Sequence, residues 1–524
     1  MQKYNIVDNV IIISKGVNDI EGETFKNRKH ITGVVMPLGV NNIGFEAFRN
    51  CTKLANVDFP CSISSIGSLA FAGCTGLKQI KIPNGIKHIG GIFTASQWLH
   101  YVHYGAFQNC TGLTDVIIPN SVETLGGYVF RGCTGLKKIE IPESVRVIGD
   151  GVFCGCTGLT RFEIPKSVKR IGVWAFGDCT NLTEIIIPEN ITDIGGMAFD
   201  NTPWLENQPD GAVYINSCLY KYKGVEPQNT SFAIKEGTSS ISDLAFKDCT
   251  FFSSIVIPDS VTRIGERVFM NCTGLTNIDI PGSLKSIGVR EFDGYSKEYY
   301  EDDGWVFRGC SNLKHIKINR GVENIGLRAF KECTSIEYIK FPETIKCIDA
   351  EAFMGCTALK SIFIPEGVEE ISYSAFAECK ALGKVVLPSS LKNLKKSAFN
   401  GCTSLMEIIV PAHNVDYVKK QLPKELHQFI KTVLFRTPVD TTPDISNDSS
   451  KEVVSSVDKV GNLKKKTKRI TLLVALALFL IYAIVSGWGL WWEWYEWLIG
   501  GLIAIIGGKI LGSFLSMILG LFKK

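Results

Sequence analysis

Residues 141–159 read IPESVRVIGDGVFCGCTGL, and versions of this phrase return along the chain with a period of 23 residues. The shared unit is P-x-x-V-x-x-I-G-x-x-A-F-x-x-C-T-x-L-x-x-I-x-I, followed by the next proline. The phrase is repeated clearly in residues 165–179, 258–272, 342–356, 365–379 and 388–402. A fixed period of roughly 20 to 29 residues with leucine-type residues at this spacing is typical of a stacked solenoid.

The repeats predict a solenoid of about fifteen coils over residues 1–411, in which residues 14–36 form a degenerate first repeat that caps the stack. Three insertions interrupt the period, near residues 91–103, 203–234 and 289–303. Solenoids usually carry such extra residues as loops on a coil. We expect the second insertion to form a small hairpin after which the repeats resume.

Within each unit, L-x-x-I-x-I predicts one short parallel strand, and the proline ends it because proline cannot donate a hydrogen bond to the ladder. The V-x-x-I segment is expected to carry the chain round the back of the coil. The G-x-x-A-F-x-x-C segment is expected to form a turn or a single helical turn, with phenylalanine inside the coil. The fold class is therefore a repeat solenoid of short parallel strands joined by turns or short helical segments.

The strands should present a variable row of side chains on the concave surface of the solenoid, because alternate residues of a strand point to opposite faces. Apolar and aromatic residues mixed with both charges there are typical of a protein-recognition surface. The alternative is that exposed β-branched residues are present only because they favour strands. The candidate ligand-binding residues are Ile117, Glu140, Arg161, Glu163, Ile186, His315, Lys317, Tyr338, Lys340 and Phe363.

Thirteen of the 17 cysteines occupy one position of the repeat, from Cys51 to Cys402. Stacked coils would bring their Cα atoms near enough for disulfides, but parallel Cβ atoms about 4.8 Å apart exceed the separation that a bridge requires. We therefore expect a column of buried free thiols that act as small apolar residues. Such a column suits a reducing compartment.

No catalytic, metal-binding or nucleotide-binding motif is found in the sequence, so we predict no enzyme and no cofactor. His100 and His103 are the only close histidine pair, and a metal site would require further ligands. The net charge of +4 and the isoelectric point near 8.2 are too small a bias to indicate nucleic acid binding.

The C-terminal part of the sequence departs from the repeat. Residues 412–436 have helix-like spacing and should cap the last coil, and residues 437–469 form a polar and then basic linker. Two apolar runs follow, at residues 470–487 and 498–522, and at 1.5 Å per residue a run of this kind is long enough to cross a bilayer. We predict a two-helix membrane hairpin over residues 470–522.

Basic residues flank the outer ends of both runs, which predicts that both ends and the repeat domain are cytoplasmic. The alternatives are that residues 498–522 lie in the membrane interface, or that the repeat domain is at the cell surface. The N-terminus lacks the basic start and long apolar run of an export signal. Small residues recur along the second run and predict helix packing, either on the first helix or between copies of the chain. They are Gly500, Ala504, Gly508, Gly512, Ser516 and Gly520.

The 23-residue period and the A-F-x-x-C-T-x-L segment resemble the BspA-type leucine-rich repeats over about residues 14–411. The resemblance implies a right-handed superhelix in proteins associated with cell surfaces, adhesion and protein binding. The missing export signal and the charged, apolar C-terminus depart from the surface members of that family. We predict a non-enzymatic, membrane-anchored scaffold or receptor-like protein. Its partners would be a protein ligand, the lipid bilayer and a second copy of the chain, with no nucleic acid. The alternative is a surface adhesin for host or matrix proteins.

Overall fold

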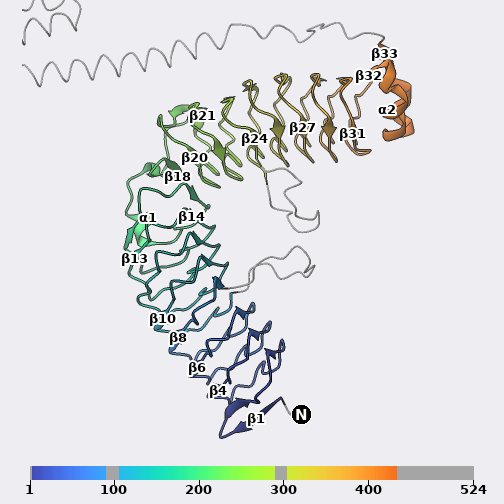
Figure 1. Cartoon of the computed structure of the whole chain (residues 1–524). Helices are drawn as coiled ribbons and strands as arrows, with labels where there is room; N and C mark the ends of the chain where they lie inside the picture. The colour runs from blue at the N-terminus through green and yellow to red at the C-terminus, as the bar shows by residue number, and fades with distance from the viewer. Residues whose placement is uncertain (1–2, 90–104, 289–303, 434–524) are drawn as a thin grey trace, which may run out of the picture. The chain divides into compact units, whose positions relative to one another are not determined.

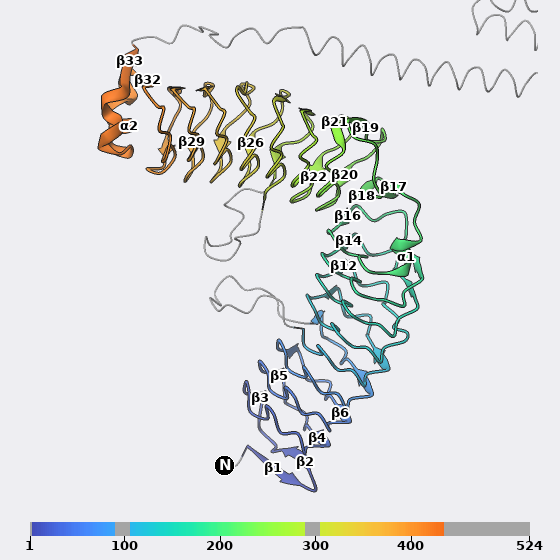
Figure 2. The same ribbon diagram turned by 180° about the vertical axis from the view of Figure 1, so that it is seen from behind.

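The computed structural model describes residues 3–89, 105–288 and 304–433, which belong to one compact unit, Met1–Asp440. Each repeat forms one coil, and the coils lie side by side from β1 to β33 (Figures 1 and 2). The membrane hairpin at residues 470–522, the helix stripe and the linker at residues 437–469 lie outside the described residues, as do His100, His103 and the insertions near residues 91–103 and 289–303.

The predicted strand is present in most coils and builds what we call the long-strand ladder. The coils at residues 136–141 and 336–341 have no such strand, apart from an isolated bridge at Lys340. The middle residue of each strand points inward, so that Phe162 of β13 pairs with Ile185 of β15 and both are buried. Most of these strands pair in parallel with the next coil. The strands are β2 (Val10–Ile13), β4 (Gly33–Val35), β6 (Asn56–Asp58), β8 (Gln79–Lys81), β10 (Asp115–Ile117), β13 (Arg161–Glu163), β15 (Glu184–Ile186), β19 (Thr230–Ala233), β21 (Phe252–Val256), β23 (Asn277–Ile280), β25 (His315–Ile318), β28 (Ser361–Phe363), β30 (Lys384–Val386) and β32 (Glu407–Pro411).

A second ladder of two-residue strands, the short-strand ladder, was not predicted. The sequence analysis took V-x-x-I only as a passage round the back of the coil, but its last two residues pair in parallel from coil to coil, as Val147 does with Arg170. The strands are β3 (Asp19–Ile20), β5 (Asn42–Ile43), β7 (Ser65–Ile66), β9 (His88–Ile89), β11 (Thr124–Leu125), β12 (Val147–Ile148), β14 (Arg170–Ile171), β16 (Asp193–Ile194), β20 (Ser240–Ile241), β22 (Arg263–Ile264), β24 (Ser286–Ile287), β26 (Asn324–Ile325), β27 (Cys347–Ile348), β29 (Glu370–Ile371) and β31 (Asn393–Leu394).

The glycine after each short strand allows the coils to approach closely at this ladder. A Cβ added at Gly149 would lie 2.6 Å from the carbonyl oxygen of Leu125 in the preceding coil. The amide of Gly149 donates to that same oxygen at 2.9 Å. The I-G pair of the repeat therefore serves a backbone contact between coils, and not only a change of direction.

The two ladders lie on opposite sides of the stack. The short-strand ladder lies on the inner side of the bend within this unit, as seen at β14 in both views and at β3 and β5 in Figure 2 (Figures 1 and 2). The long-strand ladder, seen at β4, β6 and β32, lies on the outer side. The prediction that the candidate ligand-binding residues lie on the concave surface is therefore wrong, because it assumed a single sheet on which the coils converge.

The core contains a column of phenylalanines, which occupy the phenylalanine position of the repeat. Phe307, Phe330 and Phe353 stack with ring centroids 5.0 and 5.3 Å apart and nearly parallel planes. All three are fully buried. Stacked rings contribute about 0.5–1.5 kcal/mol per pair beyond the burial of their surface.

The segment between the glycine and the cysteine forms turns in most coils, so the single helical turn weighed from the sequence is not what the described repeats use. The residue before the cysteine takes a left-handed conformation, with φ of +61° at Asn50 and +58° at Asn109. Asparagine adopts this conformation more readily than most residues. The asparagines at this position are thus explained by the fold.

The second insertion forms the predicted hairpin. Helix α1 (Pro203–Glu206) leads to β17 (Gly211–Ile215), which pairs in antiparallel fashion with β18 (Cys218–Lys223). Strand β18 then pairs in parallel with β20, so the hairpin enters the short-strand ladder. Tyr220 occupies the core beside Phe199 with a centroid distance of 5.5 Å, and its hydroxyl accepts from the Phe199 amide at 2.9 Å.

Both ends of the described stack carry non-repeat elements. At the N-terminal end β1 (Tyr4–Val7) pairs in antiparallel fashion with β2. At the other end η1 (Ala412–Asn414), α2 (Val415–Gln421), η2 (Lys424–Phe429) and β33 (Ile430–Val433) follow the last coil. The buried side chains of Val418 and Leu422 belong to the core of the last coils. The Tyr417 hydroxyl donates to the Lys392 carbonyl at 2.6 Å.

Candidate functional site

The last outward position of each long strand, with the equivalent residues Glu140 and Lys340 of the two coils that lack one, forms a line over five separate sheets, which we call the strand row. Ladder pairing sets its register, as Glu163 lies beside Ile186 and Val256 beside Asp279 and then Lys317. An isolated bridge continues the line from Lys317 to Lys340. Its members are Ile12, Val35, Asp58, Lys81, Ile117, Glu140, Glu163, Ile186, Ala233, Val256, Asp279, Lys317, Lys340, Phe363, Val386 and Ile409.

The strand row concentrates exposed apolar side chains. The described residues include twelve large hydrophobic side chains classed as exposed, and six of them belong to this row. Their exposed fractions range from 37% at Phe363 to 55% at Val35. Half of the exposed large apolar side chains thus share one position of the repeat. Exposed apolar residues that have no common role are scattered singly over a protein surface. The six are Ile12, Val35, Ile117, Ile186, Val256 and Phe363.

Charged members of the row lie between the apolar ones and form ion pairs at the surface. The Lys317 ammonium lies 3.5 Å from the Asp279 carboxylate in the neighbouring coil. Lys138 donates to Glu140 at 2.6 Å, and this hydrogen bond raises the pKa of Lys138 and lowers that of Glu140. These charges are solvated, so they suit selectivity for a partner more than the stability of the fold.

The remaining candidates lie two positions earlier in their coils and form a second, more polar row. Arg161 donates to Glu184 of the next coil at 2.7 Å. His315 is exposed at the start of β25. The ring of Tyr338 lies 5.6 Å from the Lys360 ammonium, a cation–π distance. All ten candidate residues therefore lie on the same side of the stack, along the long-strand positions.

The cysteine column consists of buried free thiols, as predicted. Nearly all of these thiols hydrogen-bond to the carbonyl of the phenylalanine in the preceding coil, for example Cys133 Sγ to Phe107 O at 3.2 Å. Burial raises the pKa of the Cys51 thiol to about 11 and that of Cys133 to about 12. Thiols held neutral in this way are poor nucleophiles and poor metal ligands. The column therefore serves packing.

Groups that could hold a metal ion are not found in the part of the chain that the structure describes. No set of three histidine, cysteine or acidic side chains there could bind a metal ion. No helix among the described residues is long and apolar enough to cross a membrane. The absence of an enzymatic activity and of a cofactor stays a prediction from the sequence.

The sequence analysis missed a group of cations on the short-strand ladder. Arg146, Lys169, Arg170 and Arg263 stand in the two variable positions of V-x-x-I, in coils near the hairpin. Basic residues recurring at these positions were a signal for a charged surface. The signal was not used because the segment was not recognised as a strand.

Two parallel ladders, a phenylalanine column and a constant 23-residue register define a leucine-rich-repeat solenoid. The chain belongs to the BspA type leucine rich repeat region family, whose model matches residues 4–105, 100–225, 213–299 and 303–422. No protein with a curated description matches the chain.

Several solved structures are similar to the chain. A leucine-rich repeat protein from Bacteroides ovatus is 23% identical, with 82% of this chain and 97% of that chain covered and a TM-score of 0.34. One from Eubacterium ventriosum is 21% identical, with coverages of 76% and 92% and a TM-score of 0.39. A leucine rich cell surface protein from Faecalibacterium prausnitzii is 24% identical, with coverages of 76% and 78% and a TM-score of 0.26.

Proposed function

We propose that this protein binds another protein through the strand row and performs no chemistry of its own. The observation that carries the proposal is the gathering of six exposed apolar side chains at one position of the repeat. Soluble surfaces place large apolar side chains in line mainly where a partner covers them. The strand preference of β-branched and aromatic residues favours the same side chains, and the crosslinking experiment below separates the two explanations.

The proposed binding mode is an extended contact over several coils. Ile117 and Ile186 would supply apolar contacts, and the charges between them would select the partner and set its register. Each coil adds a similar small contact, so affinity would grow with the number of coils that are engaged. A rigid array loses little conformational entropy when it binds.

Site-specific photo-crosslinking in the cells that produce the protein tests this proposal. A photoreactive amino acid at Ile117 or Phe363 should yield a discrete covalent adduct with one protein. The matched control is Met406, which is 70% exposed and apolar but lies outside the strand row. Equal adducts from Met406 and Phe363, or none from either row position, would count against the strand row as the binding surface.

We further propose that residues 470–522 anchor the protein in a membrane and leave the repeat domain in the cytoplasm. The support is the length of the two apolar runs and the basic residues at 464–469 and 523–524. Protease added to intact cells should then spare the repeat domain until the membrane is permeabilised. Digestion on intact cells would favour the surface adhesin, which would use the same strand row against host or matrix proteins.

A further inference from the structure

The short-strand ladder carries four cations where it runs from β12 to β22. Arg146 and Lys169 lie in one row, because the Lys169 amide donates to the Arg146 carbonyl at 2.8 Å. Arg170 lies in the next row, in register with Asp193. Arg263 stands in the same row beyond the hairpin. We call Arg146, Lys169, Arg170 and Arg263 the inner basic patch.

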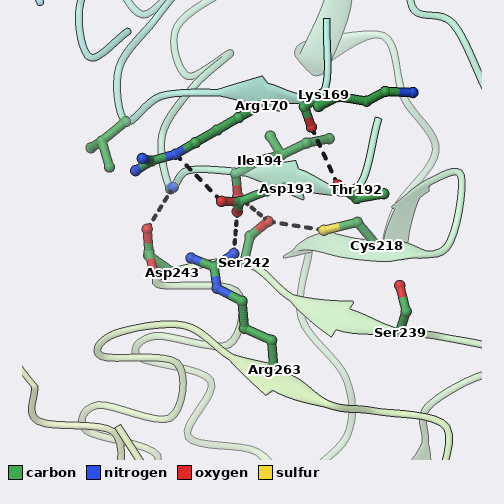
Figure 3. Close-up of polar contacts among 12 residues, drawn as sticks. Lys169, Arg170, Thr192, Asp193, Ile194, Cys218, Ser239, Ser242, Asp243 and Arg263 are labelled. Atoms are coloured by element: carbon green, nitrogen blue, oxygen red, sulfur yellow. Dashed lines mark hydrogen bonds and ion pairs between the residues drawn. The ribbon is translucent and has the colours of Figure 1, made fainter. Parts of the chain in front are cut away.

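Asp193 joins the two arginines across the hairpin (Figure 3). One carboxylate oxygen lies 3.3 Å from Arg170 Nε, and the other pairs with Arg263 Nη1. Cys218 and Ser240 occupy the ladder positions between them, and both are short and buried. The long side chains from either side therefore meet above them, although Asp193 and Arg263 are 70 residues apart in sequence.

The cations of this patch exceed its carboxylates. Asp193 is shared by two arginines, and among the described residues no carboxylate lies within ion-pair distance of Arg146 or Lys169. All four cationic residues are exposed. Each guanidinium has five N–H donors in a planar fork, and the ion pairs with Asp193 use only a part of them. The patch thus retains positive charge and donors that are held in place.

An open depression adjoins the patch at Arg146. It has a volume of about 480 Å³ and is lined by Gly85, Lys87, Asn120, Ser121, Glu123, Ser144 and Arg146. Glycine, serine and asparagine at the turns leave room there for an extended chain. The Lys87 ammonium lies 3.4 Å from the Glu123 carboxylate and pairs with it. The positive charge without a paired carboxylate in this region therefore lies on the Arg146 side.

We propose that the inner basic patch and this depression bind an acidic segment of a partner protein, at a surface separate from the strand row. Carboxylates of the segment pair with Arg146 and Lys169 and with the unused guanidinium donors of Arg170 and Arg263, as charge-assisted hydrogen bonds. Neither the patch nor the lining of the depression contains an aromatic side chain on which a base could stack. Glu123 would also repel a continuous phosphate backbone. These features favour an acidic polypeptide over nucleic acid.

Fluorescence anisotropy with the full-length protein tests the proposal. The probes are a short labelled peptide of alternating glutamate and serine, a labelled single-stranded RNA and a labelled sulfated polysaccharide. The test variant combines Arg146→Gln with Lys169→Gln, because neither side chain forms an ion pair with a described residue. The control combines Lys419→Gln with Lys420→Gln, which removes the same charge from the exposed face of α2.

The acidic peptide should bind the unmodified protein and the control equally, and the test variant about tenfold more weakly, as two charge-assisted contacts are lost. Binding should weaken as salt is added. Equal weakening in the test and control variants would overturn the site, since it would show attraction by net charge alone. Tighter binding of the RNA or the polysaccharide through Arg146 and Lys169 would overturn the class of partner. An unchanged thermal unfolding curve shows that the variants are folded.

Discussion

Replacing Phe330 by alanine tests the energetic role of the phenylalanine column. Phe330 is fully buried, and its ring lies 5.0 Å from that of Phe307 and 5.3 Å from that of Phe353. Phenylalanine-to-alanine changes in well-packed cores cost about 3–5 kcal/mol. Two stacked partners and a rigid backbone ladder on each side leave the cavity little freedom to collapse. We therefore expect the free energy of unfolding to fall by about 4–5 kcal/mol.

The matched control is Phe363→Ala, which removes the same atoms from a partly exposed position on the strand row. It should cost about 1 kcal/mol or less. Urea unfolding followed by circular dichroism measures both, and amide hydrogen exchange locates the effect. Repeat stability depends on nearest neighbours, so exchange should rise mainly in the coils that contain Phe307 and Phe353. Equal losses for the two variants would refute the reasoning, because burial would then not determine the cost.

Three further predictions concern the buried thiols, the glycines of the short-strand ladder and the ion pairs of Asp193. Burial raises the pKa of the Cys133 thiol from 9.0 to about 12. The stability that depends on keeping this thiol neutral should therefore be complete below pH 9. It should decline between pH 9 and 12, by roughly 1.4 kcal/mol per pH unit for each such thiol. A urea midpoint equal at pH 8 and pH 10 would contradict it. Gly149→Ala should lower the thermal midpoint by forcing apart two backbones, at a cost of about 1–3 kcal/mol. Gly127→Ala, whose added Cβ would meet only one carbonyl oxygen at 3.4 Å, should stay within about 0.5 kcal/mol. Asp193→Asn should destabilise the fold by about 1 kcal/mol through two partly exposed ion pairs, and should tighten binding of the acidic peptide. Asp279→Asn, with one well-exposed pair, should change neither quantity measurably.

The repeat alone determines most of the core. Phenylalanine, cysteine and the apolar residues of L-x-x-I-x-I keep one spacing, and every coil must bury them against its neighbours to be stable. Fold class, the inward and outward positions of the long strands and the free thiols could therefore be predicted. Phe162 and Ile185 are buried and Glu163 and Ile186 are exposed, as the alternation requires.

The short-strand ladder could not be recognised in the same way. A strand of two residues has no alternation to detect, and Val147–Ile148 reads equally well as part of a turn. The side of the stack toward which the coils bend depends on the spacing at both ladders. It therefore cannot be deduced from a single coil, and the concave placement of Ile117 and Phe363 failed for this reason.

The contact between Asp193 and Arg263 across the hairpin shows why a surface site can be missed when a sequence is read only through its regular repeat. Asp193 and Arg263 lie in the same row only because β18 of the hairpin takes one place in the ladder, and an insertion has no place in a repeat alignment. The same hairpin contributes Cys218, which is too short to separate the two side chains. A solenoid with uninterrupted repeats would pair charges only between adjacent coils, as Lys317 and Asp279 do. The insertion brings Arg263 to the carboxylate that already pairs with Arg170, and these two arginines together with Arg146 and Lys169 carry the surplus of positive charge on which the second binding surface depends.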